Sequence, residues 1–108
     1  MTLEDLKNIL VPNKDSLWHS ETEAERIYIL RDLGGDDRKL TGILEVHENI
    51  DLNYDIEIFI MDNSFKCLDF KNPIDSKFCD LTLSQDKNHI FIRTENSPTI
   101  LYHLRRYI

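Results

Sequence analysis

The chain has 108 residues and a formal net charge of −7, with 41% hydrophobic and 31% charged residues. This length supports one domain with a single core, residues 1–108, and the composition excludes a globally disordered chain. The acidic balance excludes nucleic acid as the expected ligand, because phosphate contacts need clustered Lys and Arg.

The sequence contains no signal for a membrane or for export. No apolar run approaches the roughly 20 residues of a membrane-spanning helix. The first ten residues include Glu4 and Asp5 and lack the basic and apolar blocks of a signal peptide. We therefore expect a cytoplasmic protein without a membrane partner. In a reducing compartment, Cys67 and Cys79 are interpreted as small strand residues rather than as a disulfide or a metal site.

The first predicted element is a helix over residues 3–10. Thr2 and Asp5 have the spacing of an N-terminal cap, and the apolar residues that follow fall on one helical face. Pro12 ends this pattern, because proline cannot continue a helix without losing a hydrogen bond.

A second helix is predicted after Ser20, which forms a capping-box pattern with Glu23. Helical spacing continues over residues 24–31, and the glycine pair at 34–35 would supply a left-handed end. A competing interpretation makes residues 27–33 a strand, because apolar side chains there also alternate.

From residue 40 the hydrophobic period changes to two, which predicts strands. The candidates are Leu40–His47, Tyr54–Met61, Phe65–Phe70, Phe78–Leu83 and His89–Thr94. Their short polar connections favour an antiparallel meander, because parallel strands need long crossovers. Residues 98–108 fit either a helix that starts at Pro98 or one more strand. The predicted fold class is α+β, with N-terminal helices packed on an antiparallel sheet of about five to six strands and a C-terminal helix or strand.

Negative charge is concentrated in residues 45–69, where seven acidic residues and one basic residue give a net charge of −6. Asp55 and Glu57 alternate with apolar residues of the predicted strand, so both side chains lie on one face. Like charges side by side on a sheet cost stability. This arrangement indicates a positively charged partner.

The C-terminal stretch has the opposite charge. Residues 87–108 contain four Lys or Arg and one Glu, a net charge of +3. One interpretation is that these bases fold back and screen the acidic strands. The other is that the acidic face stays exposed and binds another protein, or that the charge asymmetry drives self-association, for example as a homodimer.

The sequence contains no motif that is typical of a particular catalytic reaction. Asp51, Asn53 and Asp55 match the opening of a calcium-binding EF-hand loop, but Ile56 stands where the loop needs glycine. The four histidines lack metal-ligand spacing, and the three glycines form no phosphate-binding loop or nucleophile elbow. We therefore expect no catalytic residues, no metal ligands and no cofactor, and a protein that is not an enzyme.

In size, acidity and lack of catalytic motifs, the chain resembles the small acidic bacterial immunity proteins that neutralise toxins, including those of contact-dependent growth inhibition. The resemblance implies an inhibitor that covers the active-site cleft of a basic partner, most often a cognate nuclease toxin domain. The expected partner-binding carboxylates are Asp55, Glu57, Glu45, Glu48, Asp51 and Asp62. The alternative is a small ligand-binding or regulatory domain that acts as a homodimer.

Overall fold

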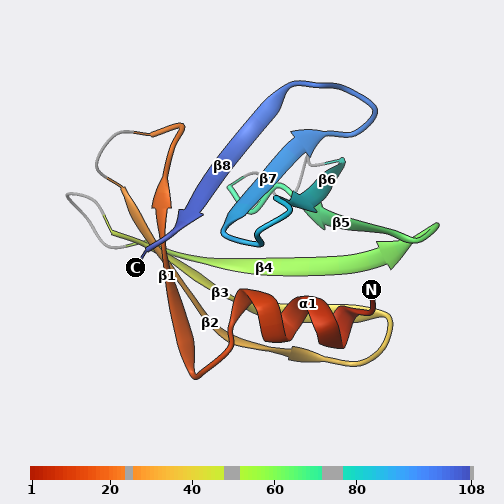
Figure 1. The fold of residues 1–108 in the computed structure, drawn as a ribbon, viewed down its shortest axis with the longest axis horizontal. Coiled ribbons are helices and arrows are strands. Elements are labelled where there is room, and N and C mark those ends of the chain that lie inside the picture. The colour runs from red at the N-terminus through yellow and green to blue at the C-terminus, as the bar shows by residue number, and fades with distance from the viewer. Residues whose placement is uncertain (24–25, 48–51, 72–76, 108) are drawn as a thin grey trace.

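The computed structural model describes residues 1–23, 26–47, 52–71 and 77–107. It consists of one short helix and eight strands that follow one another along the chain (Figure 1). The elements are α1 (Leu3–Leu10), β1 (Asp15–Ser20), β2 (Ile27–Gly35), β3 (Lys39–His47), β4 (Leu52–Met61), β5 (Ser64–Leu68), β6 (Phe78–Leu83), β7 (His89–Thr94) and β8 (Ile100–Arg106).

The strands form a closed antiparallel barrel in which each strand pairs with the next. The barrel is closed by β8 pairing with β1, where Trp18 lies opposite Arg106 and Ser20 lies opposite Leu104. Every strand therefore has a neighbour on both sides, although β4 pairs with β5 only over Ile58–Met61. The predicted fold class, helices on a sheet of five to six strands, is therefore wrong.

The predicted second helix is the main error behind that fold class. The hydroxyl of Ser20 does accept a hydrogen bond from the backbone N–H of Glu23, at 2.8 Å, as the capping pattern requires. The bond closes a turn, however, and β2 begins at Ile27. The alternating interpretation is confirmed, because Tyr28 and Leu30 point into the barrel while Ile29 between them points outward. Only as a strand can this segment pair with β1 and β3.

The other predicted helix and the predicted strands agree with the structure. The first helix is confirmed, and Thr2 and Asp5 form the complete capping box at its start. The five strands predicted between residues 40 and 94 are confirmed with small shifts in their bounds. The ambiguous C-terminal segment is a strand, and Ser97 and Pro98 lie in the turn before it.

The barrel interior is filled by apolar side chains. Inward-facing residues of every strand and three leucines of α1 form one core, in which Trp18 and Tyr28 are the largest fully buried side chains. A cavity lined by core side chains of the described residues measures about 20 Å³. Eight strands give a barrel just wide enough either to fill with side chains or to hold one small ligand. This barrel is of the filled kind.

Both ends of the barrel are covered. At one end α1 lies against β2 and β3 (Figure 1). Its Leu10 lines a small cavity inside the core. At the other end, Phe70 follows β5 and is only 3% exposed. Its ring packs against those of Tyr102, Tyr54 and Tyr28, with centroid distances of 4.5, 5.5 and 6.2 Å. In the described part of the chain, no helix is long and apolar enough to cross a membrane.

Candidate functional site on the outer face of β3 and β4

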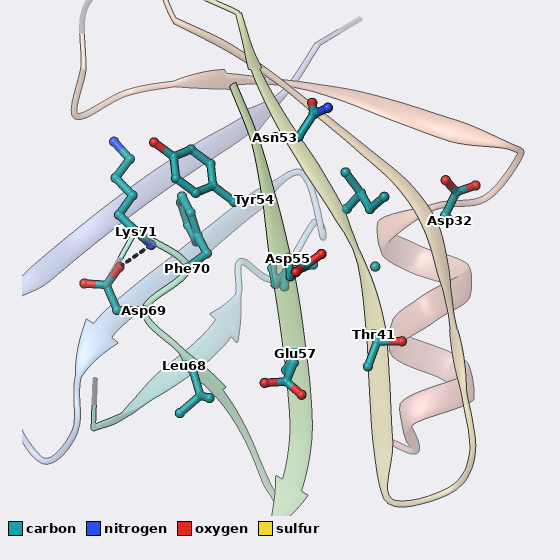
Figure 2. A pocket seen from close by; sticks show the side chains of 13 residues that line it. Asp32, Thr41, Asn53, Tyr54, Asp55, Glu57, Leu68, Asp69, Phe70 and Lys71 are labelled. Atoms are coloured by element: carbon teal, nitrogen blue, oxygen red, sulfur yellow. Dashed lines mark hydrogen bonds between the residues drawn. The ribbon is translucent and has the colours of Figure 1, made fainter. Parts of the chain in front are cut away.

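The candidate site is a surface trough of about 680 Å³ along the outer face of β3 and β4 (Figure 2). We refer to it as the acidic trough. Its polar lining includes four carboxylates and one amine, and its apolar lining includes Ile43, Leu68 and Phe70. The charged residues are Asp32, Asp55, Glu57, Asp69 and Lys71.

Asp55 lies in the middle of the trough. The alternation of β4 turns its neighbour Ile56 into the core and leaves the Asp55 side chain exposed on the outer face. Across the ladder it is opposite Ile43, which offers no charge. Within the described residues, Asp55 has neither a hydrogen bond nor an ion pair. It therefore presents an uncompensated carboxylate on a part of β4 that is paired with β3, whereas the pairing of β4 with β5 covers only Ile58–Met61.

The next acidic residue on the same face, Glu57, is partly compensated. Its carboxylate accepts a hydrogen bond from Lys39 Nζ, at 2.9 Å, and the two side chains are 36% and 44% exposed. An exposed pair of this kind contributes little stability, because water screens both charges. Glu57 therefore remains available to a partner that offers a better-placed cation.

Glu45 on β3 is held more firmly. Arg31 of β2 donates to one carboxylate oxygen, and His47 contacts the other at 3.2 Å. The hydrogen bond from Arg31, followed by that from His47, holds the pKa of Glu45 below its usual range. Glu45 lies beside the trough without lining it.

The opposite side of the trough is the short segment that follows β5. Asp69 accepts hydrogen bonds from the hydroxyl of Tyr102, at 2.8 Å, and from the backbone N–H of Lys71, at 3.0 Å. Lys71 in turn reaches both carboxylate oxygens of Glu23, at 3.1 Å. These bonds place the carboxylate of Asp69 beside the buried ring of Phe70 (Figure 2).

Asp32 reaches the trough through a β-bulge. The register of β2 against β3 shifts between Arg31 and Gly34, and Asp32 has a left-handed φ of 55°. Gly42 lies opposite this bulge. A side chain there would meet Leu33 Cδ1 at 3.0 Å and the backbone oxygen of Arg31 at 3.2 Å. The extra residue redirects the Asp32 side chain outward, where it is 62% exposed.

Not all of the predicted partner-binding residues meet at the trough. Asp55 and Glu57 line it and Glu45 lies next to it, whereas Asp62 lies in the turn between β4 and β5. Asp62 and Asn63 have φ values of 52° and 62°, as a tight two-residue hairpin requires. The predictions for Glu48 and Asp51 fall outside the described residues.

The basic C-terminal stretch does not neutralise the described acids of residues 45–69. Arg105 pairs with Glu21, Arg93 donates to the hydroxyl of Thr82, and Arg106 donates to backbone oxygens. The cations that do pair with these acids come from β2 and β3. The structure therefore favours the interpretation in which the acidic face is not screened by the C-terminal bases.

Sequence reasoning missed three charged residues of the trough. Asp69 is one of the seven acids of residues 45–69, but nothing in the sequence places it opposite Asp55. Lys71 had no role at all, and Asp32 was assigned to a helix. The one available signal for Asp32 was the following glycine pair, which also occurs where strands bend or bulge.

The four carboxylates of the trough suit it to binding cationic groups. Within the described residues, no set of three or more His, Cys, Asp and Glu side chains is arranged to hold a metal ion. Asn53 and Asp55 lie on one continuous strand, so they do not wrap around an ion as an EF-hand loop would. A cationic side chain next to an apolar one would match the carboxylates and the apolar floor.

The protein was compared with known families, curated proteins and solved structures. No family model matches the chain, and no curated protein or solved structure shows significant similarity to it.

Proposed function

We propose that this protein is an inhibitor of the immunity type, which binds a basic partner protein through the acidic trough. The partner suggested by the resemblance is a nuclease toxin domain, whose active-site cleft is positively charged because it binds a polyanion. The trough would cover that cleft and exclude the nucleic acid. Carboxylates on an exposed face also accelerate encounter with a positive partner and disfavour acidic competitors.

The observation that carries the proposal is the state of Asp55. An exposed carboxylate on a strand, without a partner in the described residues, contributes nothing evident to the fold. Its cost on the sheet is easiest to explain if a cation of another protein pairs with it. The apolar floor beside it would then bury part of the same partner, as in the core of a protein interface.

The test is co-purification with the toxin domain encoded by a neighbouring gene. The wild-type protein should form a stable complex and suppress the nuclease activity. Asp55→Lys combined with Glu57→Lys should abolish both effects, because two attractive contacts become repulsive. Association should also slow steeply as salt is added, because salt screens the steering field.

The matched control carries the same change in charge elsewhere. Asp15 and Asp37 are exposed and, within the described residues, have no ion pair or side-chain hydrogen bond. Asp15→Lys combined with Asp37→Lys should leave the complex intact. Equal loss in both double variants would mean that net charge alone drives binding, and the trough would not be the site.

A further inference from the structure

The acidic trough runs along a part of β4 that has a paired strand on one side only. β3 pairs with β4 over Leu52–Phe59, whereas β5 pairs with it only over Ile58–Met61. After Leu68 the chain leaves β4, and residues 69–71 form the opposite side of the trough (Figure 2). The first half of β4 is therefore a sheet edge that opens into the trough.

The hairpin between β4 and β5 indicates which backbone groups point to this edge. Met61 and Ser64 flank a two-residue turn with left-handed φ at both positions, so they form a hydrogen-bonded pair. Bonded and non-bonded pairs alternate along an antiparallel ladder, so every second residue before Met61 directs its N–H and C=O to the same side as Met61 does. Beyond the end of the pairing with β5, Asn53 and Asp55 belong to this set.

A second route through the sheet gives the same assignment. The backbone N–H of Ser20 donates to the carbonyl oxygen of Arg26, at 3.0 Å, which fixes the alternation between β1 and β2. Carried through the registers of β2 with β3 and of β3 with β4, it directs the backbone groups of Tyr54 to β3 and those of Asn53 and Asp55 to the opposite side. Among the described residues, no strand or loop forms a backbone hydrogen bond with that side of Asn53 or Asp55.

The charges at this edge select which strand can pair with it. An open edge is a template for another strand, and a second copy of the same chain is one candidate. Two copies joined at Asp55 would place like charges opposite each other, which is destabilising. A strand with Lys or Arg would instead place a cation opposite Asp55, at the Cβ separation of about 4.5–5.5 Å of a cross-strand pair. With four acidic side chains and one basic side chain in the trough, the edge suits a basic strand.

The other face of such a strand would meet apolar surface. Successive side chains of a strand point to opposite faces, so every second residue of the added strand would face the barrel. There the trough is lined by Phe70, whose ring centroid lies 5.5 Å from that of Tyr54. A segment in which Lys or Arg alternates with apolar residues therefore matches both the acidic and the apolar lining.

We propose that the partner protein adds an extended antiparallel strand to β4 beside Asn53 and Asp55, and that Lys or Arg alternates with apolar residues in this strand. Backbone hydrogen bonds to the two residues supply affinity, and the cation opposite Asp55 supplies specificity. This inference rests on the proposed function, because it states how the partner of that function occupies the trough. It does not require the partner to be a nuclease.

The first test needs no partner. In isotope-labelled free protein, the amide hydrogens of Asn53 and Asp55 should exchange fast and those of Tyr54 and Ile56 slowly, because only the latter two donate to β3. NMR measures the exchange of each amide. Slow exchange at Asn53 and Asp55 in the free protein would mean that the edge is closed, and would overturn the inference.

The second test titrates the protein with a synthetic peptide in which Lys and Val alternate. Binding should shift the amide signals of Asn53 and Asp55 most and slow their exchange about tenfold or more. The residue opposite Asp55 carries its side chain on the same face, so the Lys amides of the peptide donate to β4 and the Val amides point away. N-methylation of the Lys amides should therefore abolish binding, whereas the same number of methyl groups on the Val amides should preserve it. No binding of the unmodified peptide at millimolar concentration, or equal effects of the two methylation patterns, would overturn strand addition.

A pair of variants connects this binding mode with the toxin complex. Asn53→Pro removes a backbone N–H at the open edge and keeps both carboxylates, and proline is tolerated where the N–H of an edge strand faces solvent. It should weaken the complex about fivefold or more, whereas the matched control Asn53→Ala, which keeps the N–H, should change it less than about twofold. The methylated peptides cover the case in which Asn53→Pro does not fold.

The two proposals fail in different ways. A toxin complex that is lost in Asp55→Lys with Glu57→Lys but unchanged in Asn53→Pro would support the inhibitor function and overturn strand addition. A Lys–Val peptide that binds as expected while no toxin complex forms would support strand addition and overturn the inhibitor function.

Discussion

The β3–β4 face and the β7–β8 face of this barrel differ in how their charged side chains are paired. On β3 and β4, carboxylates are paired one by one with cations from neighbouring strands, and Asp55 is left over. On β7 and β8, Arg93 and the two histidines of these strands stack with Phe91 into one continuous group. Because the two faces share one apolar interior, their outward side chains can differ without disturbing the core, and the two faces can therefore serve different functions.

The largest expected effect is at Phe70, which closes the barrel beside the acidic trough. Phe70→Ala should lower the free energy of unfolding by about 3–5 kcal/mol, because it leaves a cavity in the packed core. Phe91→Ala on the other face should cost about 1 kcal/mol, the scale of a lost aromatic contact, since that ring is already half-exposed. Urea denaturation of both variants measures the contrast. Equal costs would contradict the role of Phe70 as a buried plug.

The next largest effect on stability is expected at Arg106 and not at its neighbour in β8, Arg105. Arg106 donates to the backbone oxygens of Ile9 and Lys87, at 2.7 and 3.2 Å, and lies 4.4 Å from the centre of the Trp18 ring. Arg106→Met keeps the apolar stem but loses these bonds, and should cost about 1.5–3 kcal/mol. Arg105→Met removes only a surface pair with Glu21 and should cost about 0–1 kcal/mol. Thermal unfolding of both variants shows which arginine contributes more to stability. A larger loss of stability for Arg105→Met than for Arg106→Met would contradict this prediction.

The two faces should also respond to acid in different pH ranges. The pKa of His103 is lowered in the folded state, so the unfolded chain takes up a proton first and stability falls as the pH drops below about 6.5. The pKa of Glu45 is lowered as well, but its contribution is lost only below about 4.5. His103→Gln should remove the upper step and leave the lower one. A pH series of urea midpoints would test this, and an unchanged upper step would exclude His103 as its source.

The smallest effect is expected at the residue that matters most for the proposed function. Asp55→Asn should change the free energy of unfolding by no more than about 0.5 kcal/mol. The carboxylate makes no hydrogen bond or ion pair within the described residues, so its removal breaks no such interaction there. Glu57→Gln should cost slightly more, through the weakened bond to Lys39. Chemical denaturation checks both variants. A large loss of stability in Asp55→Asn would mean that the carboxylate stabilises the fold. It would then contradict the proposal that Asp55 is exposed in order to bind a partner protein.

Parts of the site were predictable because they depend on local periodicity. Alternation along β4 is enough to place Asp55 and Glu57 on one face, whatever the strand packs against. The contribution of Asp32 was not predictable, because it depends on a bulge that exists only when β2 pairs with β3. The same holds for Asp69, whose position follows from Phe70 inserting among three tyrosines from other strands.

By itself the sequence determined the first helix, five of the eight strands, the short antiparallel connections and the concentration of acid on one strand face. These features follow from caps, turns and a period of two, all of which act within a few residues. Only the tertiary structure decided that residues 15–20, 27–35 and 100–106 are strands and that the sheet closes. The segments 27–35 and 100–106 carry patterns that fit a helix as well as a strand, and pairing with β1 supplies the backbone hydrogen bonds that make them strands.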